Sequence, residues 1–63
     1  MDKYIGLKMV EAEYMDQKSF VEIVEGRKYN STISALGYRI VTSDGKNEWK
    51  PKDEFEASYM RLS

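Results

Sequence analysis

The stretch that decides the fold is Tyr-Arg-Ile-Val-Thr-Ser-Asp-Gly-Lys-Asn-Glu-Trp, which runs from Tyr38 to Trp49. Its central Asp44-Gly45 is typical of a two-residue type I′ turn, because both residue types tolerate positive φ angles. We therefore predict a β-hairpin in which Ile40 pairs with Trp49. Tyr38 should lie beside Trp49 on the same face, and this face is the predicted core side of the hairpin.

Upstream of the hairpin, residues 3–14 alternate in a way that predicts a first strand with apolar side chains on both faces. Gly6 lies inside this strand. It marks a bulge or the close approach of another backbone, or it is simply tolerated there. One predicted face carries Ile5, Leu7 and Met9, and the other carries Tyr4, Lys8, Val10 and Ala12.

Between these strands, Asp16 can cap a helix that ends at Gly26. In that helix Phe20, Ile23 and Val24 would form one apolar stripe. The alternative for residues 16–25 is a strand, since the segment is rich in β-branched residues. Residues 26–36 contain loop formers and are predicted to be irregular.

After the hairpin, Pro51 suits the first turn of a final helix. Phe55, Tyr59 and Leu62 recur at helical spacing and would lay an aromatic stripe on the sheet. The predicted fold class is therefore α+β, with a small three-stranded antiparallel sheet and two short helices in the order β-α-loop-β-β-α. Residues 1–63 are expected to form a single domain.

Composition limits what this chain can be. It has 63 residues without cysteine or histidine, so neither disulfides nor the usual zinc ligands can reinforce a core that is marginal at this size. We therefore expect the fold to be stabilised by self-association into a homo-oligomer. The net charge of −1 argues against duplex nucleic acid as the main partner. No apolar run is long enough for a membrane span or a signal peptide, so we expect a cytoplasmic protein with no membrane partner.

The sequence offers little for catalysis. Histidine is absent, and the serine and threonine hydroxyls have no histidine to activate them as nucleophiles. No glycine-rich phosphate loop or calcium-binding loop is present either. We therefore expect a protein that is not an enzyme and that uses no metal and no cofactor.

What remains suits a binding protein. Five tyrosines, two phenylalanines and one tryptophan can stack on planar rings, and ten basic side chains can hold phosphates. Tyr38, Trp49 and Phe55 are expected in the core rather than on a ligand platform. Arg27 and Lys28, beside Tyr29 in the irregular segment, are better candidates for a binding site.

The C-terminal half resembles a family of very small bacteriophage and prophage proteins that end in a Trp-x-Pro-Lys-x-x-Phe-Glu-x-x-Tyr motif. The residues that carry the resemblance are Gly37–Val41, Asp44-Gly45, Trp49–Lys52 and Phe55–Tyr59. At the N-terminus Tyr4-Ile5-Gly6-x-Lys8, with Ala12 and Met15, is similar to the opening strand of that family.

Two departures from the family pattern matter. Lys50 and Asp53 stand where the family has a serine before the proline and a glutamate two residues after it, so the capping box is lost or reversed. A shorter, more basic segment with Arg27 and Lys28 replaces the family's long polar loop. If that loop selects a ligand, the ligand of this chain can differ.

The resemblance implies an accessory phage protein, similar to sponge proteins that sequester the cyclic nucleotide signals of CBASS-type bacterial immunity. The first hypothesis is therefore a non-enzymatic anti-defence protein that binds a cyclic di- or trinucleotide at an oligomer interface. The second is a phage accessory protein that binds a host protein directly, such as a defence protein. The expected ligand-binding residues of the first are Tyr4, Lys8, Arg27, Lys28, Arg39, Trp49 and Lys52.

Overall fold

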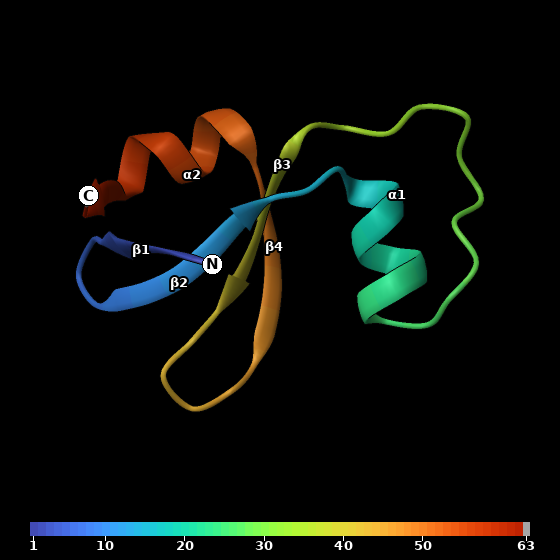
Figure 1. Cartoon of the computed structure of the whole chain (residues 1–63). Helices are drawn as coiled ribbons and strands as arrows, with labels where there is room; N and C mark the ends of the chain where they lie inside the picture. Colours follow the sequence, from blue (N-terminus) through green and yellow to red (C-terminus); the bar gives the residue numbers. More distant parts are fainter. Residues whose placement is uncertain (63) are drawn as a thin grey trace.

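A computed structural model describes residues 1–62, which form one antiparallel sheet with helix α2 packed on one face (Figure 1). The sheet has five strands in the order β4-β3-β2-β1-β5. The predicted α+β class is confirmed, and the predicted three-stranded sheet is wrong. The elements are β1 (Asp2–Ile5), β2 (Met9–Tyr14), α1 (Gln17–Ser19), the π-helical turn η1 (Phe20–Val24), β3 (Gly37–Val41), β4 (Asn47–Pro51), α2 (Lys52–Ser58) and β5 (Met60–Leu62).

The first additional strand arises because the predicted strand 3–14 folds back on itself as the hairpin β1–β2, with Ile5 paired to Met9. The turn begins at Gly6, where a Cβ atom would lie 2.7 Å from the carbonyl oxygen of Ser58 and 3.0 Å from the Tyr59 ring. Gly6 therefore marks the close approach of another backbone, which was one of its three interpretations. No bulky residue fits where the end of α2 passes this turn.

The hairpin β3–β4 exists as predicted, but its turn and register differ. Gly45 has a φ of +86°, and no non-glycine residue of the described chain has a positive φ, so the turn is not type I′. The Thr42 amide donates to the Lys46 carbonyl oxygen at 3.0 Å, which closes a three-residue loop over 43–45, and within it the Gly45 amide donates to the Thr42 carbonyl oxygen at 2.9 Å. Trp49 therefore pairs with Arg39. The predicted pairing of Ile40 with Trp49 is wrong by one residue.

This shift moves Trp49 to the other face of the sheet, since neighbouring residues of a strand point in opposite directions. Ile40 is buried on the face that α2 covers, whereas Trp49 lies half-buried on the opposite face. Tyr38 remains on the α2 face. The expectation that Trp49 shares the core with Ile40 and Tyr38 is therefore wrong.

The core lies between the sheet and α2. It contains Val10, Ala12, Ile40 and Phe55, with the half-buried Tyr4, Tyr38 and Tyr59 packed around them. Phe55 is fully buried at the centre, and its ring stacks on Tyr38 with centroids 4.4 Å apart and on Tyr59 at 4.7 Å. Tyr4 meets the same ring edge-on at 4.9 Å. The predicted contact of Phe55 and Tyr59 with the sheet is confirmed.

The predicted final helix is too long at both ends. Pro51 ends β4 and caps the helix, which begins at Lys52. The helix stops at Ser58 because Tyr59 is extended, with φ −130° and ψ 144°. The chain then pairs with β1 as β5, so Leu62 lies opposite Lys3 instead of continuing the helical stripe.

The helix predicted from Asp16 is present, and the strand alternative for residues 16–25 is wrong. The Asp16 carboxylate accepts hydrogen bonds from the backbone amide and hydroxyl of Ser19, at 3.3 and 2.6 Å. Beyond α1 the turns widen, as the Glu25 amide donates to the Phe20 carbonyl oxygen five residues back. Because of this π geometry Ile23 leaves the predicted stripe and is exposed, while Phe20 is buried.

Residues 26–36 contain neither helix nor strand, as predicted. Side chains fix their course instead. The Tyr29 hydroxyl donates to the Ile33 carbonyl oxygen at 2.7 Å, and the Ser34 hydroxyl donates to Asp16 at 2.7 Å. In Figure 1 this segment and α1 extend to the side of the sheet.

The sheet face opposite α2 has several exposed apolar side chains. We call it the bare face and define it by Ile5, Met9, Met60 and Leu62, with Lys3, Glu11 and Val41 around them. Ile5, Met9 and Met60 lie side by side on β1, β2 and β5.

None of the helices in residues 1–62 has the length and apolar character of a membrane span.

Candidate functional site: a notch between two hairpin loops

A hollow of about 590 Å³ opens where β2 and β3 diverge. The pairing of these strands stops at Glu11 and Val41, so Met9 and Val10 no longer contact β3 as ladder partners. The β1–β2 turn lies on one side of the opening and the β3–β4 loop on the other. We call this hollow the notch and define it by Leu7, Lys8, Thr42, Asp44, Lys46, Glu48 and Tyr59.

The charged groups of the notch balance one another. Lys8 and Lys46 supply two amines, and Asp44 and Glu48 supply two carboxylates. Asp44 accepts a hydrogen bond from the Thr42 hydroxyl, which lowers the pKa of its carboxyl, with a smaller contribution from the charge of Lys8. Asp44 is therefore ionised near neutral pH, and one copy of the notch has little net charge.

Uncharged groups complete the wall. The Tyr59 ring is half-buried between α2 and β5, and Leu7 projects from the β1–β2 turn with its side chain fully exposed. The Thr42 hydroxyl is held in the loop, where it accepts a hydrogen bond from the Lys46 amide at 3.2 Å. The notch therefore combines one aromatic surface, two amines and a fixed hydroxyl. Within residues 1–62 no group of three or more acidic side chains is placed to hold a metal ion.

The structure does not gather the seven predicted ligand-binding residues. Of these, Lys8 alone lines the notch. Tyr4 packs in the core against Phe55, on the α2 face. Lys52 lies exposed at the start of α2, where its backbone amide donates to the Leu36 carbonyl oxygen.

Arg27 and Lys28 lie on the exposed segment that connects η1 to β3, and neither belongs to one of the two hairpin loops. The Arg27 guanidinium contacts the Glu25 carboxylate at 2.6 Å. This ion pair lies largely in solvent, so it contributes little to stability. These two cations line neither the notch nor the smaller hollow on the bare face.

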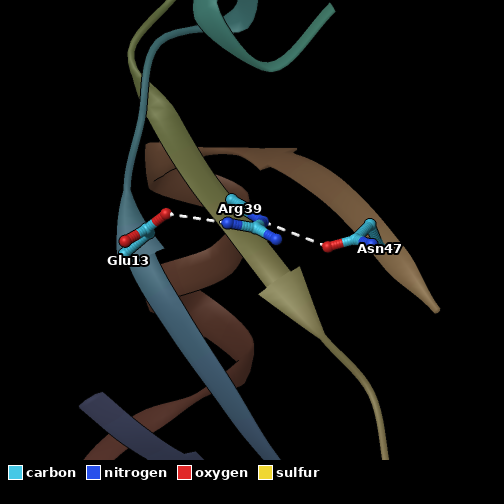
Figure 2. A network of polar contacts seen from close by, with 3 residues as sticks. All are labelled: Glu13, Arg39 and Asn47. Carbon is cyan, nitrogen blue, oxygen red and sulfur yellow. Dashed lines mark hydrogen bonds and ion pairs between the residues drawn. The ribbon is translucent and has the colours of Figure 1, made fainter. Parts of the chain in front are cut away.

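Arg39 and Trp49 are the two predicted residues that do come together, as a directly opposed pair on β3 and β4. Figure 2 shows Arg39 lying across its strand between Glu13 of β2 and Asn47 of β4. Its Nη1 contacts Glu13 Oε1 at 3.2 Å, and its Nε donates to Asn47 Oδ1 at 3.0 Å. Arg39 thus ties three neighbouring strands together.

Trp49 has structural contacts that account for its position. Its Nε1–H donates to the Met15 carbonyl oxygen at 2.7 Å. Its ring covers Gly37, where a Cβ atom would lie only 2.5 Å from the ring and 2.2 Å from the Lys50 carbonyl oxygen. Such packing of an aromatic ring over a strand glycine compensates for the missing side chain.

Lys46 and Tyr59 are notch residues that sequence reasoning did not select. Lys46 directly follows the Asp44-Gly45 turn, and Lys8 lies in the turn between β1 and β2. Once the first strand is seen as a hairpin, antiparallel pairing brings both turns to the same end of the sheet. The missing signal was therefore the turn at residues 6–8.

Comparisons with known proteins leave the site to be interpreted from its own geometry. No protein-family model, no curated protein and no solved structure matches this chain.

Proposed function

We propose that this chain is a non-enzymatic phage accessory protein that sequesters a cyclic oligonucleotide immune signal in the host cytoplasm. The supporting observation is the notch, in which Lys8, Lys46 and Tyr59 border a hollow of about 590 Å³. Ligand pockets for small molecules range from about 300 to 1,000 Å³, so the notch has the size for a nucleotide.

The chemistry of the wall suits such a ligand. Nucleobases stack on aromatic rings, and phosphates accept hydrogen bonds from lysine amines. Each notch contains as many carboxylates as amines, because Asp44 and Glu48 offset Lys8 and Lys46. Lys8 and Lys46 would therefore act through direct contacts with the phosphates rather than through net charge. A cyclic dinucleotide has two anionic phosphates, and two copies of the chain around one ligand would offer four amines to them.

The test is isothermal titration of the protein with a panel of cyclic di- and trinucleotides. One member should bind, and both Lys8→Ala and Lys46→Ala should weaken its affinity by tenfold or more. Lys28→Ala is the matched control, because it removes the same charge from a segment that does not line the notch. Equal weakening by Lys28→Ala would move the site away from the notch. Absence of binding by every nucleotide would overturn the proposal.

A second candidate function is direct binding of a host protein, and the bare face favours it. Exposed apolar side chains that cluster on one face are typical of protein interaction sites. This alternative predicts that Met60→Glu abolishes anti-defence activity in infected cells while Lys8→Ala does not. Met60 is exposed, so its replacement should leave the fold intact.

A further inference from the structure

We propose that the bare face pairs with the bare face of a second copy, with a two-fold axis that runs parallel to the strands between β1 and β2. This inference names the surface of self-association, and it does not require that the notch binds a nucleotide. Its centre is the row Met9, Ile5 and Met60 on three adjacent strands, with Leu62 on the next row.

The exposure of these side chains is the first observation. Ile5 is 39% exposed, Leu62 44%, Met9 53% and Met60 72%. They lie next to one another, unlike the isolated apolar residues that every protein surface contains. Burying them in a dimer would remove this apolar surface from water, which stabilises the association.

The chain is less compact than is typical for its length, and its core is small. The chain exposes 4637 Å². A monomer of 7.4 kDa is expected to expose about 4,200 Å². Its radius of gyration is 11.7 Å. About 10.6 Å is typical for this length. Part of this excess comes from α1 and residues 26–36, which extend to the side of the sheet (Figure 1). The central core cluster has only four buried residues, so burial of a second apolar face would add to a small core.

Charge complementarity selects a second copy as the occupant. Lys3 and Glu11 are direct cross-strand neighbours on β1 and β2, at one edge of the apolar row. Rotation by a half-turn about the proposed axis places β1 of one copy opposite β2 of the other. Each Lys3 then faces the Glu11 of the other copy, and two intermolecular ion pairs form. Within residues 1–62 of one copy, neither side chain is in an ion pair.

The same rotation matches the apolar side chains. Met9 of each copy faces Ile5 of the other. Leu62 on β5 faces Val41 on β3, because β5 and β3 are equally distant from the axis. Met60 faces the start of the β3–β4 loop of the other copy, because β3 ends at Val41. The apolar matching is therefore carried by Met9, Ile5, Leu62 and Val41, in the self-complementary arrangement of a two-fold interface between identical chains.

The interface also reaches the notch. A smaller hollow of about 180 Å³ on the bare face is lined by Lys3, Glu11 and Val41. It shares Met9 and Thr42 with the notch. Pairing of two bare faces would bring two notches to the border of one interface.

The test is sedimentation equilibrium of the nucleotide-free chain from micromolar to millimolar concentration. A monomer–dimer equilibrium is expected. Met60→Glu should weaken it at least tenfold, whereas Ile33→Glu should leave it unchanged, since Ile33 is as exposed but lies on the segment 26–36. Circular dichroism confirms that each variant is folded.

Charge reversal decides between a second copy and any other occupant. Lys3→Glu and Glu11→Lys should each weaken the dimer severalfold, and the double variant should restore it. A monomer at every concentration, or a dimer that these variants do not change, would overturn the inference. Nucleotide titration is measured separately, so failure of the proposed function and failure of this interface give different results.

Discussion

The contact between Gly37 and Trp49 gives the sharpest test of the structure. In Gly37→Ala the added methyl would lie 2.2 Å from the Lys50 carbonyl oxygen and 2.5 Å from the Trp49 ring. Real Cβ atoms do not approach other atoms so closely, so the strands β3 and β4 must separate or the ring must leave. Because one neighbour is backbone, the variant should fall at the upper end of the cost of overpacking, about 3 kcal/mol.

That cost is large for this chain. At 63 residues the whole free energy of unfolding is expected to be about 3–9 kcal/mol. A loss of about 3 kcal/mol should lower the melting temperature by about 12–24 °C. Urea unfolding can be followed by the fluorescence of Trp49, which is the single tryptophan and lies at the site of the change.

Gly26→Ala is the matched control. Gly26 has a φ of +70° and no other atom within 4 Å of the added Cβ position. This variant introduces backbone strain without a steric clash, and the strain should lower the free energy of unfolding by about 1–2 kcal/mol. If Gly37→Ala lost no more stability than Gly26→Ala, the one-residue register that places Trp49 over Gly37 would be refuted.

Three further predictions concern other parts of the fold. Hydrogen bonds from Ser19 and Ser34 lower the pKa of Asp16 from 3.8 to about 2, so its contribution to stability is present above pH 4 and is lost as the pH falls toward 2. In Asp16→Asn the loss of stability between pH 4 and pH 2 should be smaller than in the original chain. An unchanged acid-denaturation curve would contradict the capping interaction. The hydrogen bond from Tyr38 to Glu56 raises the pKa of the Tyr38 hydroxyl from 10.0 to about 12. The stability that this hydrogen bond contributes is therefore present below pH 10 and is lost as the pH rises through 12. In Tyr38→Phe the melting temperature should fall less steeply over this pH range. Phe55→Ala removes the fully buried centre of the core and should cost about 3–5 kcal/mol, enough to leave much of the protein unfolded by circular dichroism at room temperature.

The hairpin shows how much local sequence could predict. Asp44-Gly45 located the turn correctly, because glycine takes the left-handed conformation that the loop needs. The two-residue and three-residue loops differ less in free energy than turn and no turn do, so the sequence pattern did not separate them. The Thr42 hydroxyl favours the three-residue loop by contacting Asp44 and the Lys46 amide. One extra residue in that loop was enough to exchange the faces of β4.

The other differences come from contacts between residues far apart in the chain. Alternation in residues 3–14 continues on both sides of Gly6, so the pattern does not reveal the fold-back that the end of α2 imposes. Likewise, Tyr59 leaves the helix because β1 offers an edge for β5. The candidate site was found only in part, since the notch depends on this unpredicted turn bringing Lys8 toward Lys46.

The pairing of β1 with β5 has a consequence for how the chain is made. Lys3 and Leu62 are partners in the ladder, so this contact joins nearly the whole length of the described chain. Such non-local contacts form late, whereas hairpins such as β1–β2 and β3–β4 close locally within microseconds. During synthesis the outer edge of β1 therefore stays open until β5 has emerged from the ribosome. In that interval the edge of β1 is available for pairing with other nascent chains. When β5 pairs with it, the new edge of the sheet is a strand of only three residues, and a short edge strand offers less of a template for such pairing.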